Sequence, residues 1–108
     1  MAKYSDGLDA VSVALAHRGR RQAVARLTRA PASSSELAEH LAVSLPTMQR
    51  HLDVLKKADL VRSTKRGRVV THELRAEPLR RYHEWLAART SFWTDQLDAL
   101  DTHLKEQP

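Results

Sequence analysis

Two groups of side chains in this sequence have the types and spacing to bind a polyanion. Residues 44–51 read SLPTMQRH, where hydroxyl, amide, guanidinium and imidazole groups are interspersed with apolar side chains. Residues 64–68 read TKRGR, in which three cations surround one glycine. Arginine and glutamine can form bidentate hydrogen bonds with base edges, while lysine and arginine pair with phosphates. The chemistry that both groups offer is recognition of nucleic acid.

The first group lies on a predicted helix over residues 44–58. Ser44 can cap its N-terminus, and Pro46 stands in the first turn, where a missing N–H breaks no hydrogen bond. At about 100° per residue, four apolar side chains share an arc of about 80°, which we predict to be the core face. These are Leu45, Met48, Leu52 and Leu55. We expect DNA contacts from the residues off this face, with His51 at the border, where it could pack inward or touch a phosphate. They are Ser44, Pro46, Thr47, Gln49, Arg50 and His51.

The second group lies at the tip of a predicted hairpin within residues 61–75. Short strands are expected over residues 60–64 and 69–74, and Gly67 can adopt the positive φ that their turn requires. Arginine on a narrow loop fits a minor groove or its flanking phosphates. The expected DNA contacts of the hairpin are Lys65, Arg66 and Arg68.

The second strand of this hairpin also has an inward face. Val70, His72 and Leu74 alternate along it and are predicted to point toward the core. We therefore interpret His72 as a half-buried core residue rather than a ligand of a metal or substrate.

Positive charge is concentrated on the hairpin. The chain of 108 residues has a formal net charge of +5. Residues 61–75 hold five Lys and Arg against one acid, whereas residues 76–108 hold four against six acids. A solvated face usually mixes signs, so the distribution favours a polyanionic partner at the hairpin.

The remaining elements complete a familiar order. Helices are predicted over about 5–16, 20–29 and 34–41, and a long helix runs from Pro78 to about Leu104. Ser33 and Glu36 form a capping box before the third helix. Helix, turn, helix and hairpin across residues 33–75 predict a winged helix-turn-helix. The expected fold is mainly α, with five helices and a two-stranded wing, in a single domain over 1–108.

The long last helix has two apolar faces. One carries Leu79, Tyr82, Leu86, Trp93, Leu97, Leu100 and Leu104, and the other carries Trp85, Ala88, Phe92 and Ala99. A small core cannot easily bury both faces of a helix of about 39 Å. We therefore expect one face to pack on its own domain and the other on a second copy. The alternative is that both faces surround a single core, and the residues do not say which face would form the seam.

Catalysis, metal binding and membrane insertion are not expected. The sequence has no cysteine, which excludes disulfides and thiolate metal sites. It shows no Ser/His/Asp order, Gly-rich phosphate loop or metal cluster, and its six histidines are scattered. We predict no enzyme and no cofactor. The N-terminus lacks an apolar signal region and no stretch reaches membrane-spanning length, so a cytoplasmic protein is expected.

A series of short motifs carries a resemblance to a known family. In order they are Ala14-Leu15-Ala16, Arg20-Arg21, Ser35-Glu36-Leu37-Ala38, Ser44-Leu45-Pro46-Thr47-Met48, His51-Leu52, Val54-Leu55, Ala58-Asp59-Leu60-Val61 and Arg66-Gly67-Arg68. With this order and spacing, nearly the whole chain resembles the ArsR-type winged-helix repressors. The resemblance implies a homodimer that blocks transcription from a palindromic operator and pairs through its first and last helices. The interface residues expected on this basis are Leu8, Val11, Tyr82, Trp85, Leu86, Phe92, Trp93, Leu97, Leu100 and Leu104.

Departures from the family pattern limit what the resemblance carries over. One branch senses metals through Cys-x-Cys in the third helix, which has no cysteine here. Another uses Asp-x-His in the last helix with a further His and acid, and Asp101-x-His103 supplies only the first half. We therefore expect no metal site. His17 and Gly19 replace a frequent Asp and Thr, and Gln49 stands where Ser is common. The operator sequence therefore does not transfer.

Two functional classes remain open from the sequence. The first is a sequence-specific DNA-binding transcriptional regulator, expected to be a homodimeric repressor. The alternative is a winged-helix module that binds another protein, with an incidental basic wing. Arg50 and the charge of the wing favour the first class. No feature of the sequence indicates an effector.

Overall fold

The helices and strands follow the predicted order. The computed structural model describes the backbone of residues 3–106 and the side chains of residues 7–106. Its elements are α1 (Lys3–Leu15), α2 (Arg18–Leu27), β1 (Ala32–Ser33), α3 (Ser34–Leu41), α4 (Leu45–Lys57), β2 (Val61–Arg66), β3 (Val69–Leu74) and α5 (Ala76–Glu106). The prediction of a mainly helical winged helix-turn-helix with five helices is confirmed. Among residues 3–106, no helix combines the length and apolar character that crossing a membrane requires.

Side chains just before three helices fix where those helices begin. Ser33 and Glu36 form the predicted capping box at the start of α3. Ser44 accepts a hydrogen bond from the backbone N–H of Thr47 and so caps α4, whose first turn contains a proline. The start of α2 uses a less usual cap, because His17 Nδ1 accepts from the backbone N–H of Gly19 at 2.9 Å. These caps determine where α2, α3 and α4 begin.

The wing is part of a three-stranded antiparallel sheet rather than a lone hairpin. Its strand order is β1-β3-β2, and Ala32 in β1 pairs with His72 in β3. The predicted two-stranded wing therefore missed β1, because a strand of two residues is too short to show alternation. The hairpin pairs Val61 with Leu74 at its base and Arg66 with Val69 at its tip. Gly67 adopts φ +62° at the turn, as predicted.

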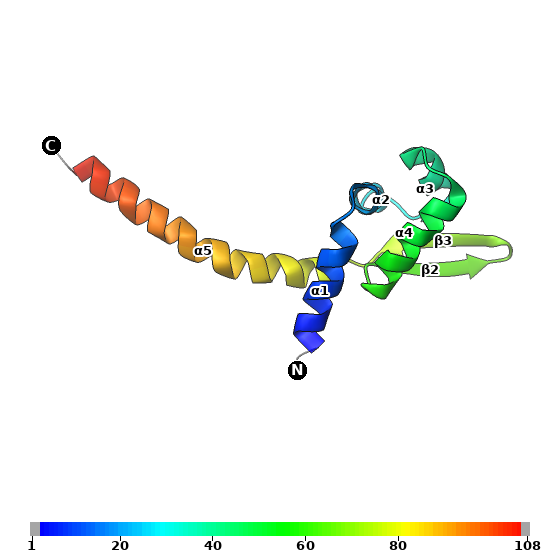
Figure 1. Ribbon diagram of the computed structural model, residues 1–108, viewed down its shortest axis with the longest axis horizontal. Helices are drawn as coiled ribbons and strands as arrows, with labels where there is room; N and C mark the ends of the chain where they lie inside the picture. The colour runs from blue at the N-terminus through cyan, green and yellow to red at the C-terminus, as the bar shows by residue number, and fades with distance from the viewer. Residues whose placement is uncertain (1–2, 107–108) are drawn as a thin grey trace.

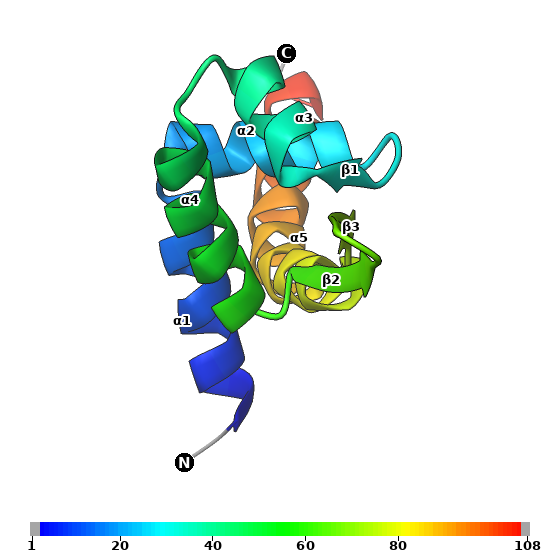
Figure 2. The ribbon, with the colours of Figure 1, turned by 90° about the vertical axis from the view of Figure 1, so that its right-hand side faces the viewer.

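The core is formed where α1, α2, α3 and α4 meet the base of the wing. Figure 2 shows α1 and α4 side by side, with α2 and α3 across their ends. Met48, Leu52 and Leu55 are fully buried, as the helical pattern predicted. The prediction for Leu45 was wrong, since its side chain is 45% exposed. His51 is buried instead. At about 100° per residue, the arc of buried side chains on α4 is therefore centred about 70° around the helix from Leu45.

The last helix leaves the domain and projects from it. In Figure 1, α5 starts behind α1 and extends away from the wing, and the whole molecule measures 71 × 35 × 20 Å. Leu79 and Tyr82 pack against the core, and Tyr82 Oη lies 2.9 Å from Ser12 Oγ. From Leu86 onward every described side chain of α5 is exposed.

This course decides between the two expectations for α5. The helix packs on its own domain only through its first turns, so the alternative in which both faces surround one core was wrong. The expected packing of one whole face on its own domain holds for that first part alone. The rest of the domain lies beside the first turns of α5 (Figure 1), and no described side chain from residue 86 to residue 106 is buried.

Candidate nucleic-acid interface

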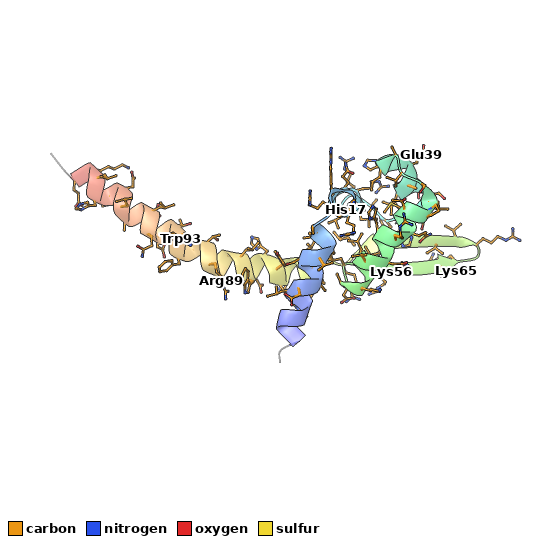
Figure 3. The ribbon with its side chains drawn as sticks, in the orientation of Figure 1. His17, Glu39, Lys56, Lys65, Arg89 and Trp93 are labelled. Atoms are coloured by element: carbon orange, nitrogen blue, oxygen red, sulfur yellow. The ribbon has the colours of Figure 1, made fainter. Side chains whose placement is uncertain are left out.

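The polar residues singled out in the sequence lie at the end of the molecule away from α5. There α3, α4 and the hairpin form one surface, with Lys65 on the hairpin and Glu39 on α3 (Figure 3). Most of the candidate DNA-contacting residues are exposed. These are Ser44, Pro46, Gln49, Arg50, Lys65, Arg66 and Arg68. Thr47 is half-buried, and His51 is buried.

The first turn of α4 holds three of these residues in one hydrogen-bonded group. Ser44 Oγ donates to Thr47 Oγ1 at 3.0 Å, in addition to capping the helix. Thr47 Oγ1 also accepts from Arg50 Nη2 at 3.2 Å. A guanidinium has five N–H donors, so this tether orients Arg50 and still leaves donors for a ligand. Arg50 is therefore an oriented cation at the exposed N-terminal half of α4.

His51 does not share this surface. Only 7% of the residue is exposed, and its ring centroid lies 4.6 Å from that of His17. Burial lowers the pKa of His51, and electrostatic repulsion by His17, Arg20 and Arg50 lowers it further. The sequence pattern places this ring where it could touch a phosphate. The structure corrects that expectation, because a buried, neutral imidazole offers a phosphate neither access nor charge.

The side chain of Gln49 is exposed, but it is hydrogen-bonded to a group that reaches a buried histidine. Its Nε2 donates to Ser34 Oγ at 3.2 Å, and Ser34 Oγ lies 2.7 Å from Nε2 of His72. The other ring nitrogen of His72 lies 2.6 Å from Ser63 Oγ. His72 is 1% exposed, so its predicted place in the core is confirmed and is deeper than the half-burial we expected. Sequence reasoning missed Ser34 and Ser63, because no local pattern brings α3, β2 and β3 together.

A shallow groove of about 350 Å³ lies between the start of α4 and the wing. It is lined by Ser33, Ser34, Ser35, Leu45, Gln49, Arg68, Val69 and Val70. Leu45 and Val69 are 45% and 56% exposed. Apolar side chains at this position could contact the methyl group of thymine beside the polar contacts of Gln49. Neither residue is among the DNA contacts predicted from the sequence, which assigns Leu45 to the core face of its helix and Val69 to a strand.

The charges of the wing divide into paired and unpaired groups. Arg62 lies 3.9 Å from Glu73, and Arg75 lies 3.6 Å from Asp59. Among the side chains of residues 7–106, which the structure describes, no ion pair involves Lys65, Arg66 or Arg68. The uncompensated charge therefore sits at the tip, where a phosphate backbone can approach it.

The residues expected at a dimer interface are distributed over buried and exposed positions. Val11 was a wrong choice, because it is 1% exposed and belongs to the protomer's own core. Leu8, Tyr82 and Trp85 are partly buried. The others lie on the projecting part of α5 and are 42–65% exposed: Leu86, Phe92, Trp93, Leu97, Leu100 and Leu104. Arg89 covers one face of Trp85, with its guanidinium carbon 4.4 Å from the ring centroid.

The structure offers no metal centre in the part that it describes. Within the described side chains, those of residues 7–106, no group of three or more His, Cys, Asp or Glu residues could hold an ion. Asp101, half of the metal-like motif in the sequence, pairs with Lys105 at 2.9 Å. The carboxylate of Asp101 therefore belongs to a surface ion pair on α5.

Comparisons with known proteins agree with this architecture. A family model described as a helix-turn-helix domain matches residues 15–64. A solved ArsR family transcriptional regulator is 36% identical over 87% of this chain and 97% of its own, with a TM-score of 0.77. An ArsR-like transcriptional regulator from Rhodococcus sp. RHA1 is 27% identical over 98% and 100% of the two chains, with a TM-score of 0.76. A possible transcriptional regulator for arsenical resistance is 33% identical over 91% and 95%, with a TM-score of 0.65. No curated protein matches the sequence.

Proposed function

The chain belongs to the ArsR family of transcriptional regulators, and on that premise we propose that it is a homodimeric repressor of a palindromic operator. It is a DNA-binding regulator with a helix-turn-helix and not an enzyme. The proposed domain plan is a single winged-helix unit over residues 1–108, with pairing helices at both ends.

The exposed half of α4 is the element that we place in the major groove. One observation carries this assignment: Gln49 and Arg50 are both exposed in the first two turns, and each is held by a hydrogen bond from its own domain. Side chains held in advance lose less conformational freedom on binding. Arg50 fits O6 and N7 of guanine, and Gln49 fits N6 and N7 of adenine. Ser44, Pro46 and Thr47 would lie against the adjoining backbone.

The tip of the wing is the second contact. Lys65, Arg66 and Arg68 carry the uncompensated charge on a narrow two-stranded turn. Such a turn fits the adjacent minor groove or the phosphates on either side of it. These contacts would supply affinity that is largely independent of sequence.

The projecting part of α5 is the surface that we assign to a second copy of this chain. Large apolar side chains recur there at spacings of three, four and seven within an arc of about 60°. They are Leu86, Trp93, Leu97, Leu100 and Leu104. An apolar stripe of this length on a monomer marks an interaction site. A stripe with this periodicity pairs best with the same stripe of a twin, through a two-fold axis.

We place the seam between the two copies on the face of α5 that carries this stripe. Its first members, Leu79 and Tyr82, already pack on the protomer's own core. The stripe then continues past the end of the domain, so the partner's α5 would extend a core that begins beside α1. Leu8, which is half-buried on α1, lies in the element that this partner would also reach.

In this proposal the protein represses transcription by occupying the operator. A dimer that covers an operator prevents polymerase from using the same DNA, and this requires no further surface on the protein. We propose no metal or cofactor for binding, since the sequence has no cysteine and the described residues form no metal centre. The proposed site of action is the cytoplasm, with DNA and a second copy of the chain as partners.

The proposal is tested by selecting a binding site from random duplex DNA with the purified full chain. We expect the selected sites to contain two inverted half-sites separated by one helical turn, about 10 base pairs centre to centre. A footprint should protect both half-sites together. A reporter driven from a promoter that carries the selected site should fall when the protein is expressed. A single asymmetric site, or a reporter that rises, would contradict the proposal.

A further inference from the structure

A chain of hydrogen bonds runs beneath the surface from the wing to α4. Ser63 on β2 contacts Nδ1 of His72 on β3 at 2.6 Å, and Nε2 of the same ring contacts Ser34 on α3 at 2.7 Å. Ser34 in turn accepts from Nε2 of Gln49 on α4 at 3.2 Å. The helix pair α3 and α4 and the hairpin strands β2 and β3 are thus joined through one imidazole.

The imidazole at the centre of this chain is buried and neutral. His72 is 1% exposed, and burial lowers its pKa, with the positive charge of Lys56 acting in the same direction. A neutral imidazole has one N–H donor and one bare nitrogen acceptor. One of the two serine hydroxyls must therefore accept from the protonated ring nitrogen, and the other must donate to the unprotonated one.

One direction of donation along this chain uses the hydroxyl proton of Ser34 and so links the tautomer of His72 to the contact of Gln49. Because Nε2 of Gln49 donates to Ser34 Oγ, the hydroxyl proton of Ser34 is free to donate to Nε2 of His72. The ring proton then lies on Nδ1 and donates to Ser63 Oγ. In the other tautomer Nε2 of the ring would donate to Ser34, whose own proton would then be free, so that Ser34 could meet either end of the Gln49 amide. Only the tautomer with its proton on Nδ1 therefore restricts Gln49 to one direction, with Nε2 inward.

We propose that His72 is a positioning residue for sequence recognition, which acts through Ser34 to hold the Gln49 amide with Nε2 inward and Oε1 toward DNA. The inference rests on the proposed function, in which Gln49 faces the major groove. Oε1 then presents an acceptor, and the second N–H of the amide remains a donor beside it. Adenine offers the matching pair, a donor at N6 and an acceptor at N7, so His72 favours adenine at the base pair that Gln49 meets.

The first test concerns the free protein and does not depend on DNA. Long-range nitrogen NMR spectra of the full chain should show the ring proton of His72 on Nδ1. The side-chain amide signals of Gln49 should move, and its amide protons exchange faster, in Ser34→Ala. The matched control is Ser35→Ala, which removes an exposed hydroxyl from the same turn. A ring proton on Nε2, or amide signals that respond equally to both variants, would overturn the proposal.

The second test is a double-mutant cycle on DNA. The measured quantity is the ratio of affinities for the selected site and for the same site with the preferred base pair under Gln49 replaced. Ser34→Ala should lower this ratio roughly fivefold to tenfold, a part of what a bidentate contact supplies. In a Gln49→Ala background Ser34→Ala should lower it no further, because residues that act through one contact are not additive. His72→Gln, which can donate and accept, should keep more of the ratio than His72→Phe.

The outcomes separate this inference from the proposed function. If Gln49→Ala leaves the ratio unchanged, Gln49 does not read a base, and the proposed placement of α4 fails whatever the NMR spectra show. If Gln49→Ala lowers the ratio and Ser34→Ala lowers it equally in both backgrounds, α4 is placed correctly but His72 does not act through Gln49. Either result removes the positioning role, and only the second leaves the proposed function standing.

Discussion

Nε2 of His51 lies 2.8 Å from the position that a Cβ atom would occupy on Gly19. The absence of a side chain at Gly19 thus leaves the space in which the imidazole of α4 is buried against α2. His17 closes the same space from the other side, with Nδ1 at 3.2 Å from that position. The two departures from the family pattern at residues 17 and 19 therefore belong together, because both surround the ring of His51.

Replacing Gly19 by alanine should destabilise the protein. A methyl group would force the ring of His51 to move, and overpacking of this kind costs about 1–3 kcal/mol. Alanine gains at most about 1 kcal/mol over glycine in a helix, so the loss should outweigh the gain. Gly7→Ala is the matched control, because nothing lies within 4 Å of its added Cβ, and it should stabilise α1. Urea denaturation measures both, and equal stabilisation by the two variants would show that His51 does not need the space.

Stability should fall as the pH is lowered from 7.5 to 5. Burial holds the pKa of His51 and of His72 below the ordinary value of 6.5 in the folded chain. The unfolded chain binds these protons first, so folding loses free energy as the pH falls below 6.5 and through the folded values. The lowered pKa values of Glu36 and Glu77 act mainly below pH 4.5, so they contribute little in this window. Urea midpoints across this range measure the slope. His51→Gln should flatten it, and a midpoint that stays constant or rises toward pH 5 would contradict the assignment.

Alanine at Arg50 or Gln49 should reduce binding to the selected operator without unfolding the protein. Exposed substitutions usually change stability by no more than about 0.5 kcal/mol. Removing each bidentate hydrogen bond to a base should cost about 1–3 kcal/mol of discrimination, and binding to random DNA should be affected much less. Lys57→Ala is the control, since it removes a cation from the exposed far end of the same helix. Competition between operator and scrambled DNA measures the ratio. An unchanged ratio in both variants would mean that other residues read the bases.

Removing cations from the tip of the wing should weaken binding to all DNA alike. Lys65→Ala, Arg66→Ala and Arg68→Ala should each flatten the dependence of affinity on salt. The slope of log K against log salt changes by about 0.9 for each phosphate that the variant no longer neutralises. Arg62→Ala removes a cation that already pairs with Glu73, and it should change the slope less. Titrations at several salt concentrations check this, and normal slopes in all the tip variants would exclude the wing as a DNA-binding element.

Charge placed in the apolar stripe of α5 should separate the proposed dimer. Trp93→Glu or Leu97→Glu would bury an unpaired carboxylate in the seam, which is strongly unfavourable. Ser91→Glu adds the same charge about 160° away from Trp93 around the helix and should leave the assembly intact. Sedimentation of the three variants and the wild type at micromolar concentration measures the mass. A wild-type monomer would refute the dimer, and equal effects of Ser91→Glu and Trp93→Glu would refute the seam.

Local signals in the sequence were sufficient for the helices and the turn of the wing. Ser33 with Glu36, Ser44 with Pro46, and Gly67 each fix an element through neighbours a few residues away, and all were predicted. Contacts between distant segments carried no such signal. The pairing of β1 with β3 and the hydrogen bonds of His72 depend on where whole elements come to rest.

The two errors in burial have the same origin. Periodicity alone centres the predicted arc of α4 near Leu45, whereas the space beside Gly19 of α2 accommodates the ring of His51, and Leu45 is exposed. Val11 belongs to an apolar stripe that either the core or a partner could bury, and the position of α1 in the core decided it. Helical periodicity identifies an apolar face but does not say what covers it.

The length of α5 also has a genetic consequence. The proposed DNA surface and the proposed pairing stripe lie at opposite ends of the molecule (Figure 1), so a mutation in one should leave the other intact. In a cell with two alleles, a chain with Arg50→Ala would still pair with wild-type chains, and the mixed dimers would bind the operator poorly. A chain that stops before Leu86 would pair with nothing and leave the wild-type dimers unharmed. Alleles that damage α4 should therefore be dominant, and alleles that truncate α5 should be recessive.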